Sequence, residues 1–366
     1  MRDEDYMKLA LRLARRGLGN TSPNPMVGAV IVKGGRIIGR GYHHYFGGNH
    51  AEVDAIKHSV EDVTGATMYV NMEPCFHYGK TPPCVDAVIN NKITKVVIGM
   101  QDPDLRVNGK SIDKLKQASI ETVVGVLEEE CRVMNEAYIK HRSTGIPFVT
   151  VKFAQTLDGR IAAADGSSRW IASPESLKLA HRLRATHDAI LAGVNNVLID
   201  NPELTLRLVK GRSPTRIILD SKLRIPLEAK VFQEQEKAPT IIATTPAADD
   251  GKLAVLRERG IEVIIVATDL QGGVDLGRLL STLGERDITS ILVEGGSRVI
   301  TSFIRRNLFD RLVVIVAPKI LGKGLESIGD LNIENINQAL SLSFEKTYRL
   351  GNDFVVEARI NPPDTA

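Results

Sequence analysis

Four residues of the sequence have the types and spacing of a hydrolytic zinc site: His50, Glu52, Cys75 and Cys84. A zinc ion held by one neutral histidine and two cysteine thiolates keeps a fourth coordination position for water, and it lowers the pKa of that water to about 7. Glu52 follows His50 closely and would carry protons without binding the metal. These residues therefore predict a zinc centre that activates water at neutral pH.

Helix starts would position two of these ligands. Thr81 is a suitable N-cap residue and the prolines after it suit a first helical turn, so we expect a helix with Cys84 near its start and its end near Asn91. His50 precedes an apolar-periodic stretch at 51–58, which predicts a second helix. The dipole of a helix N-terminus favours a thiolate, as a metal does. We therefore expect the metal where two helix N-termini converge.

Other interpretations of the same residues remain open. A lone histidine is often structural, and cysteines of an intracellular chain are often small buried apolar residues. A closed structural zinc site would need four protein ligands, whereas three convincing ones are present. The order of the H-A-E, P-C and P-P-C segments, with a glutamate that is not a ligand, is typical of zinc-dependent nucleobase deaminases and favours a catalytic site.

Length and composition limit the class of protein. A chain of 366 residues with 43% hydrophobic and 25% charged residues is an ordinary globular protein with room for two domains. No segment approaches the roughly 20 apolar residues of a membrane span, and the acidic start at 1–5 is unlike a signal peptide, so we expect a cytoplasmic protein without a membrane partner. A net charge of +3 without a Lys/Arg-rich run predicts no nucleic-acid partner. Three cysteines, with Cys131 inside an expected helix, do not predict a disulfide framework.

The first part of the chain alternates helices and strands, which predicts a largely parallel sheet covered on both faces. A β-hairpin with a Gly34-Gly35 turn should begin this part. We place the domain boundary in the polar turn at 142–147. The expected elements are helix 6–17, strands 26–32 and 36–39, helix 51–58, strand 67–70, helix 84–91, strand 95–98, helix 112–117, strand 120–124 and helix 127–139.

A second alternation follows the boundary. Its last expected strand leads directly into Glu294, Gly295 and Gly296, where backbone N–H groups and a helix dipole could bind a phosphate. Two glycines at such a turn are more often ordinary turn residues with positive φ. Without a G-x-G-x-x-G segment, the pattern does not predict a standard dinucleotide fold. The expected elements are strand 148–154, helix 174–186, strands 189–193, 216–219 and 240–243, helix 252–259, strand 261–266, helix 276–283, strand 290–293 and helix 298–306.

Together these segments resemble the bifunctional deaminase/reductases of riboflavin biosynthesis, and the resemblance covers nearly the whole chain. In the first half it rests on N-P-M-V-G-A-V at 24–30, G-Y-H at 41–43, H-A-E at 50–52 and E-P-C-F-H-Y-G-K-T-P-P-C at 73–84. The long loop between Cys75 and Cys84 replaces the C-x-x-C spacing of most zinc deaminases and is characteristic of the riboflavin enzymes. The resemblance implies a cytidine-deaminase-like three-layer α/β/α domain at 1–145.

The second half resembles the reductase part of the same family, which implies a dihydrofolate-reductase-like α/β domain at 146–366 that uses NADPH. Asn196 departs from the threonine that the family usually places against the cofactor, but its amide could still hydrogen-bond a phosphate. The matching segments are K-F-A-Q-T-L-D-G-R at 152–160, S-R-W-I at 168–171, D-A-I-L-A-G at 188–193, D-N-P at 200–202, L-T-L-R at 204–207, L-D-S at 219–221 and V-E-G-G-S at 293–297.

For the first domain, the resemblance implies removal of the 2-amino group of 2,5-diamino-6-ribosylamino-4(3H)-pyrimidinone 5′-phosphate. Asn24 precedes a proline and could instead be a turn residue, and Lys80 could be a solvated loop lysine. The implied residues are His50, Cys75 and Cys84 for Zn²⁺, Glu52 for proton transfer, Asn24 for the base edge, and His43 and Lys80 for the ribosyl phosphate.

For the second domain, the resemblance implies that NADPH delivers hydride to C1′ of the ribosyl group. The partners would be pyrimidine ribotides, and we expect a homo-oligomer. Lys152 and Ala154 share one face of a strand, so Lys152 could meet the sugar from the edge of the sheet. Without the resemblance, Trp170 would be assigned to the core and Arg184 to the solvated face of a helix. The implied residues are Lys152, Asp200 and Glu294 at the sugar, Ser168, Arg184, Leu204, Arg207 and Glu294 for the substrate, and Ala154, Trp170, Asn196, Asp200, Ser221, Gly295 and Gly296 for NADPH.

Two rival functions stay open at this point. One is a deaminase of cytosine-type or tRNA bases whose second domain binds RNA, although the near-neutral charge and the long loop between the cysteines argue against it. The other is a non-catalytic binding protein stabilised by zinc, in which Glu52 would have no chemical role.

Overall fold

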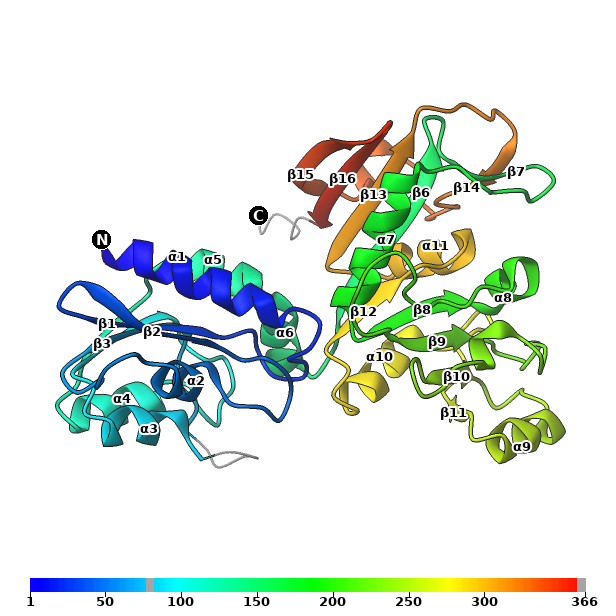
Figure 1. The fold of residues 1–366 in the computed structure, drawn as a ribbon. Coiled ribbons are helices and arrows are strands. Elements are labelled where there is room, and N and C mark those ends of the chain that lie inside the picture. The colour runs from blue at the N-terminus through cyan, green and yellow to red at the C-terminus, as the bar shows by residue number, and fades with distance from the viewer. Residues whose placement is uncertain (77–81, 361–366) are drawn as a thin grey trace. The chain divides into compact units, whose positions relative to one another are not determined.

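The chain forms two compact units, Met1–Ile146 and Pro147–Ala366 (Figure 1). The computed structural model describes residues 1–76 and 82–360. Each unit contains its own sheet. Within the described residues, no helix combines the length and the apolar character that crossing a lipid bilayer requires.

A five-stranded sheet organises the first unit, in the order β2-β1-β3-β4-β5. Its strands are β1 (Gly28–Lys33), β2 (Arg36–Tyr42), β3 (Thr67–Met72), β4 (Lys95–Met100) and β5 (Glu121–Val124). β1 runs antiparallel to both β2 and β3, whereas β3, β4 and β5 are parallel. The expectation of a largely parallel sheet is therefore wrong for its first half, because the expected Gly34-Gly35 turn joins antiparallel neighbours.

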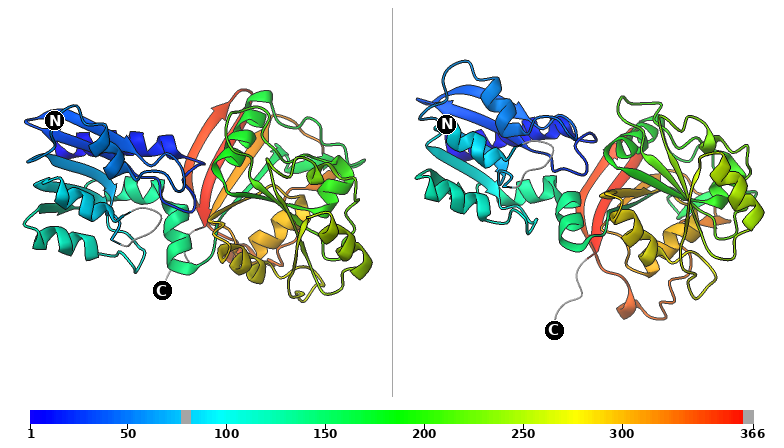
Figure 2. Two further views of the ribbon diagram at one scale, coloured as in Figure 1. Left: turned by 60° about the horizontal axis from the view of Figure 1, so that its bottom comes forward. Right: turned by 90° about the horizontal axis from the view of Figure 1, so that it is seen from below.

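Helices cover both faces of this sheet, which gives three layers (Figure 2). The helices are α1 (Asp3–Ala14), α2 (Ala51–Lys57), α3 (Cys84–Asn90), α4 (Lys110–Gln117), α5 (Glu128–Met134) and α6 (Glu136–Thr144). α1, α5 and α6 share one buried apolar cluster with the strands, and α2, α3 and α4 share the other. The expected three-layer α/β/α arrangement is confirmed.

The helix expected at 127–139 is two helices, α5 and α6, which Asn135 separates. The side-chain oxygen of Asn135 accepts a hydrogen bond from the Met26 N–H at 2.8 Å, and its amide donates to the Met26 carbonyl at 3.1 Å. A side chain committed to distant backbone in this way favours a break in the helix. α6 then continues through Thr144, so the turn expected at 142–147 begins later than expected.

Glycine allows α2 to lie directly against β2. A Cβ atom at Gly41 would lie 2.2 Å from the backbone nitrogen of Ala55, a separation that real Cβ atoms do not show. His50 is the N-cap of α2 and Glu52 lies in its first turn. The position of two predicted site residues therefore depends on this close contact between helix and strand.

A nine-stranded sheet organises the second unit, in the order β11-β10-β9-β8-β12-β6-β13-β16-β15. Neighbours from β11 to β13 are parallel, and β16 and β15 continue the sheet antiparallel. A separate pair joins β14 to β7. The strands are β6 (Phe148–Thr156), β7 (Arg160–Ala163), β8 (Ala189–Gly193), β9 (Thr215–Leu219), β10 (Thr240–Thr244), β11 (Glu262–Ile265), β12 (Ser290–Val293), β13 (Arg311–Ala317), β14 (Gly324–Glu326), β15 (Leu342–Leu350) and β16 (Asp353–Ile360).

Five helices of the second unit connect these strands. They are α7 (Pro174–Thr186), α8 (Val194–Asp200), α9 (Asp250–Glu258), α10 (Leu276–Gly284) and α11 (Ser297–Arg305). Every element that we expected here is present, but α8, β7 and the strands after α11 were not predicted. Lys152 lies on β6, an interior strand between β12 and β13, so the expectation that it acts from the edge of the sheet is wrong.

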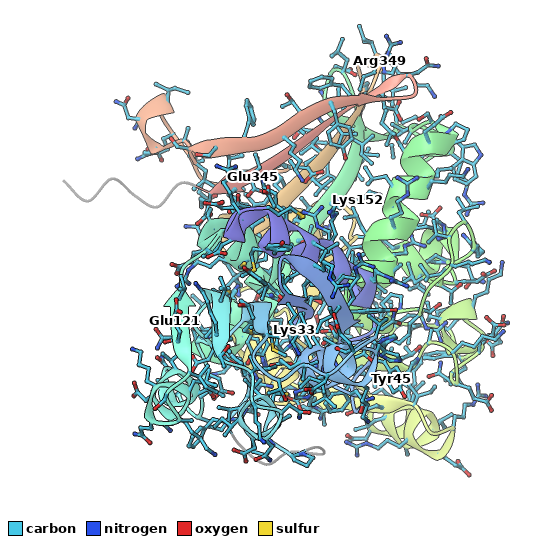
Figure 3. The ribbon with its side chains drawn as sticks, turned by 60° about the vertical axis from the view of Figure 1, so that its left-hand side comes forward. Lys33, Tyr45, Glu121, Lys152, Glu345 and Arg349 are labelled. Carbon is cyan, nitrogen blue, oxygen red and sulfur yellow. The ribbon has the colours of Figure 1, made fainter. Side chains whose placement is uncertain are left out.

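Ion pairs connect the edge strand β15 to its neighbour β16 and to β13, the strand beyond it. Glu345 on β15, labelled in Figure 3, pairs with Arg311 of β13 at 3.2 Å and also with Arg359 of β16. Lys152 and Arg349, on β6 and β15, are labelled in the same view. Paired charges of opposite sign on adjacent strands help to hold the register of the edge strand.

Gly41→Ala should destabilise the first unit and loosen its hold on zinc, because the new methyl group pushes α2 and its metal ligand outward. We expect a loss of about 1–3 kcal/mol in unfolding free energy, typical of overpacking. Thermal melting and zinc content after dialysis would measure this. Gly251→Ala is the control, because a Cβ there meets only one contact, at 3.4 Å. Unchanged melting of the Gly41 variant would contradict the close-contact explanation.

Candidate active sites

The three predicted metal ligands lie together. The Nδ1 atom of His50 is 3.5 Å from the sulfur of Cys75 and 3.2 Å from the sulfur of Cys84, and all three ligand atoms lie within 4.8 Å of one another. Tetrahedral zinc with usual bond lengths places its nitrogen and sulfur ligands about 3.5 Å apart. The donor set and its spacing therefore fit one zinc ion.

Cys84 opens helix α3, as expected, but the N-cap is Pro83 and not Thr81. The Pro83 carbonyl accepts the first helical hydrogen bonds, from Asp86 at 3.2 Å and Ala87 at 3.4 Å. The prolines therefore precede the helix instead of forming its first turn. Thr81 itself lies outside the described residues.

Hydrogen bonds at the start of α3 stabilise a thiolate on Cys75. The sulfur of Cys75 accepts the backbone N–H of Cys84 at 3.2 Å. The hydrogen bond from the Cys84 thiol, together with the nearby His50, lowers the pKa of Cys75. The same hydrogen bond and burial raise the pKa of Cys84, so the pair keeps one proton, on Cys84, and zinc binding would release it.

Glu52 lies beside the ligands and is nearly inaccessible to solvent, with 3% of its surface exposed. Burial is the main cause that raises its pKa to about 7, and the neighbouring Cys75 adds to the shift. A carboxyl group with a pKa near neutrality can both accept and release a proton at physiological pH. Its place and its acidity suit a proton carrier.

Two of the predicted substrate residues form a pair near the ligands. The Nδ2 amide of Asn24 lies 3.2 Å from Nε2 of His43, and Nδ1 of His43 lies 2.9 Å from the Asn49 carbonyl. His43 therefore donates from Nδ1 and accepts at Nε2, and burial lowers its pKa. A neutral histidine offers no charge to a phosphate, so this geometry suits His43 better for orienting Asn24. Lys80, the third predicted substrate residue, lies outside the described residues.

Glu73 is a structural residue of this site that sequence reasoning missed. Its buried carboxylate accepts backbone N–H groups of Asp102, Gly109 and Ser111 at 3.2, 2.9 and 3.1 Å. It thereby ties the end of β3, just before Cys75, to the start of α4. The only signal in the sequence was its place next to Pro74 and Cys75.

A cavity of about 930 Å³ in the second unit gathers most of the predicted reductase residues. Arg184, Leu204, Arg207 and Ser221 are not among the residues that line it. The side chain of Leu204 is 5% exposed and belongs to an apolar core cluster. The predicted residues that line the cavity are Lys152, Ala154, Ser168, Trp170, Asn196, Asp200, Glu294, Gly295 and Gly296.

A cluster of buried charges lies at one wall of this cavity. Glu294 binds Arg184 through two hydrogen bonds of 3.0 and 2.9 Å, and its carboxylate is 3.7 Å from the Lys152 ammonium. Burial alone would raise the pKa of Glu294, but the charges of Arg184 and Lys152 outweigh it and lower the pKa to about 2. The solvated alternative for Arg184 is therefore wrong. The cluster keeps one surplus positive charge.

The glycine turn after β12 is required for close packing. A Cβ atom at Gly295 would lie 2.6 Å from Cβ of Val299, and neither Gly295 nor Gly296 has a positive φ. The side-chain oxygen of Asn196 accepts the Gly296 N–H at 2.9 Å, which leaves the amide nitrogen for a ligand. Trp170 is 64% exposed, so its alternative assignment to the core is wrong.

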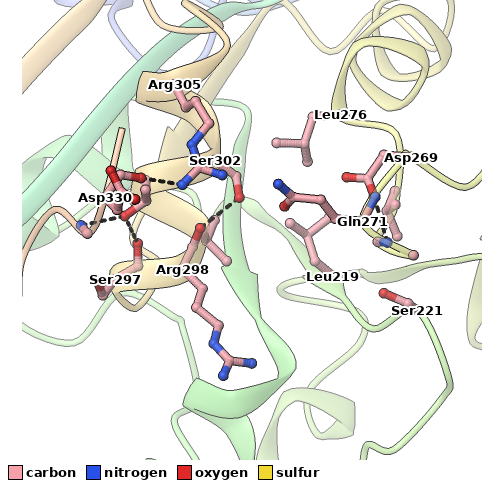
Figure 4. A pocket seen from close by; sticks show the side chains of 16 residues that line it. Leu219, Ser221, Asp269, Gln271, Leu276, Ser297, Arg298, Ser302, Arg305 and Asp330 are labelled. Atoms are coloured by element: carbon pink, nitrogen blue, oxygen red, sulfur yellow. Dashed lines mark hydrogen bonds between the residues drawn. The ribbon is translucent and has the colours of Figure 1, made fainter. Parts of the chain in front are cut away.

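A second cavity, of about 600 Å³, continues from the first (Figure 4). Leu219, Ser297, Arg298 and Val299 line both, and the predicted cofactor residue Ser221 lines only the second. Sequence reasoning missed the polar side chains that α11 and the loop after β11 contribute here. The polar side chains of these two segments that the figure labels are Asp269, Gln271, Ser297, Arg298, Ser302 and Arg305.

Two family models match the chain. Residues 1–100 match the cytidine and deoxycytidylate deaminase zinc-binding region, and residues 147–356 match the RibD C-terminal domain. The model boundaries fall within the two compact units of the structure.

Relatives match over nearly the whole chain. The riboflavin biosynthesis protein RibD of Aquifex aeolicus is 48% identical, with 97% of each chain covered, and that of Escherichia coli is 37% identical, with 96% of this chain and 98% of the relative covered.

A solved structure from Thermotoga maritima, described as a diaminohydroxyphosphoribosylaminopyrimidine deaminase/5-amino-6-(5-phosphoribosylamino)uracil reductase, is 39% identical. It aligns with a TM-score of 0.87 over 98% of this chain and 99% of its own. Both expected domain folds are confirmed by these matches. The chain therefore belongs to the RibD family of riboflavin biosynthesis and is a bifunctional deaminase and reductase.

Proposed function

We propose that the site at His50, Cys75 and Cys84 deaminates 2,5-diamino-6-ribosylamino-4(3H)-pyrimidinone 5′-phosphate, and that the cavity around Lys152 and Glu294 reduces the ribosyl group of the product. The two activities would reside in residues 1–145 and 146–366. The observation that carries the proposal is the convergence of the three ligands beside a buried carboxyl group in a separate unit from the charged cavity.

In the deaminase, zinc bound by the three ligands supplies a water molecule of lowered pKa. Glu52 would take a proton from that water and give it to the ring nitrogen while the water oxygen bonds to C2, the carbon that carries the amine. It would then move the second proton of the same oxygen to the amine. The bond from C2 to the amine would break as C2 becomes a carbonyl carbon and ammonia leaves. Asn24 holds the edge of the base through its amide, and His43 fixes the orientation of Asn24. Burial excludes bulk water from Glu52, which keeps its pKa suitable for both steps.

In the reductase, bound NADPH supplies hydride to C1′ of the sugar. As C1′ takes the hydride, the bond from C1′ to the ring oxygen breaks, and that oxygen takes a proton from the Lys152 ammonium. Glu294 holds Lys152 in place and orients Arg184. Asp200, at the end of α8, lines the same cavity and would contact both sugar and cofactor.

The adenosine part of NADPH would occupy the second cavity, because the two cavities share the start of α11. Arg298 borders both cavities and suits the pyrophosphate, whereas Arg305 borders only the second and suits the ribose 2′-phosphate. Arg305 donates from Nη2 to the Asp330 carbonyl, and both residues line the second cavity. The other N–H groups of its guanidinium would be the ones to meet a phosphate.

A homo-oligomer in the cytoplasm completes the proposal. Phe344 is 72% exposed on β15, the edge strand of the large sheet, and exposed apolar groups on an edge strand favour pairing with another chain. Light scattering of the purified protein would give its mass.

Glu52→Gln should lower the deaminase turnover number about 10²–10⁴-fold, because the amide cannot carry protons. Zinc should stay bound, since Glu52 is not a ligand. Ammonia release from the diaminopyrimidine ribotide measures the turnover number, and the zinc content of the same sample shows whether the metal is retained. Glu61→Gln, at an exposed ion pair with Arg36, is the control. An active Glu52 variant would rule out its role as proton carrier.

Glu294→Gln should slow NADPH oxidation on the order of 100-fold, because Lys152 and Arg184 lose the carboxylate that orients them. Deamination should be unaffected. Both reactions can be followed in one sample through ammonia and NADPH absorbance. The exposed Glu326, paired with Arg160, supplies the control variant Glu326→Gln. If both activities fell together in a folded protein, independent sites would be excluded.

Arg305→Gln should raise the Kd for NADPH about 10- to 100-fold and leave the Kd for NADH unchanged, because a charged hydrogen bond contributes about 1.5–3 kcal/mol. Arg298→Gln should raise both constants. Quenching of protein fluorescence measures binding without turnover. Arg278→Gln, which lines neither cavity, is the control. Equal weakening of NADPH and NADH by Arg305→Gln would place the 2′-phosphate elsewhere.

A further inference from the structure

Helix α7 holds the segment Thr205–Arg207 at two points. Arg184 donates from Nη1 to the Thr205 carbonyl at 3.3 Å, and the backbone N–H of Arg207 donates to Nδ1 of His181 at 3.2 Å. Between them, the N–H of Leu206 donates to the Ser213 hydroxyl at 3.2 Å. The Thr205 carbonyl and the N–H groups of Leu206 and Arg207 therefore each have a defined partner.

His181 can act only as an acceptor at Nδ1. A backbone N–H always donates, so the ring must be unprotonated at this nitrogen. His181 is 5% exposed, and burial, with the charges of Arg184 and Arg207 nearby, lowers its pKa to about 4. The ring is therefore neutral at physiological pH and stays available to the Arg207 N–H.

The guanidinium of Arg207 is the available cation of this region. The Arg207 side chain is 55% exposed and pairs with Glu203 at 2.8 Å. The Arg184 side chain is only 13% exposed, and it is engaged by both oxygens of Glu294. A planar guanidinium at a partly open position can bind a phosphate through two hydrogen bonds.

We propose that His181 is a positioning residue for recognition of the substrate's 5′-phosphate in the reductase. It holds the backbone of Arg207 at a fixed distance from the helix that carries Arg184, so that the Arg207 guanidinium is oriented before the phosphate arrives. Orientation in advance lowers the entropy lost on binding. This inference rests on the proposed function, with Arg207 as the substrate residue that the resemblance implies. Arg207 does not line the cavity, but Arg184, which holds the same segment, binds the Glu294 that does.

A pair of polar substitutions tests the role of Nδ1. The side-chain oxygen of asparagine can occupy the place of Nδ1, whereas the longer glutamine places its amide near Nε2. His181→Asn should therefore keep the KM for the aminouracil ribotide within about threefold of the unchanged protein, and His181→Gln should raise it about tenfold or more. The turnover number and the Kd for NADPH should change less than about threefold in both variants.

Binding of ribose 5-phosphate, measured by calorimetry, adds a readout that needs no turnover. His181→Gln should weaken it and His181→Asn should not. In a protein that already carries Arg207→Gln, the second substitution His181→Gln should change the Kd for ribose 5-phosphate little. The reason is that His181 and Arg207 would affect the phosphate through the same contact. Equal behaviour of the Asn and Gln variants would overturn the inference. If the unchanged protein bound ribose 5-phosphate as expected but did not oxidise NADPH, the proposed function would fail and the role of His181 would stand.

Discussion

The deaminase half depends on one geometric constraint: an imidazole and two sulfurs from three separate segments must meet within the reach of a single ion. The start of α2 supplies His50, the loop after β3 supplies Cys75 and the start of α3 supplies Cys84. Gly41 allows α2 to approach the sheet, and Glu73 anchors the end of β3. These two contacts keep the three ligand-bearing segments in fixed positions relative to one another.

The reductase half depends on a different balance. Glu294 lies at 11% side-chain exposure, and an isolated carboxylate there would be costly, because removing one partner of a buried ion pair leaves an uncompensated charge. Arg184 and Lys152 provide the compensation from α7 and β6. The surplus positive charge that results borders a cavity, and it suits an anionic substrate and cofactor. The same residues therefore serve stability and recognition.

Local signals in the sequence predicted much of the fold. The helix expected at 174–186 and the strands expected at 189–193 and 290–293 have the bounds of α7, β8 and β12. β15 was missed because it is largely exposed and lacks a continuous apolar run. β13 was missed although its sequence R-L-V-V-I-V-A carries the apolar run of a buried strand. Asn135 broke a predicted helix through a contact with Met26, distant in the sequence. The helix propensity of the residues around Asn135 does not indicate such a long-range contact.

In the candidate sites, too, local sequence signals were predictive and contacts between distant residues were not. The zinc ligands were predicted because their types and spacing are specific, whereas the pairing of Arg184 with Glu294 could not be predicted from either residue's neighbours. Cys131, the remaining cysteine, lies in the apolar cluster on the opposite face of the sheet from α2 and α3. The geometry therefore provides three protein ligands among the described residues.

X-ray absorption spectroscopy of the zinc-loaded protein tests this claim most directly. The account predicts two sulfur ligands at about 2.3 Å and two lighter ligands at about 2.0–2.1 Å, one from His50 and one from solvent. An added thiol inhibitor should replace the solvent ligand, and the number of sulfur ligands at about 2.3 Å should rise from two to three. A spectrum with four protein ligands and no exchangeable position would contradict an active metal centre.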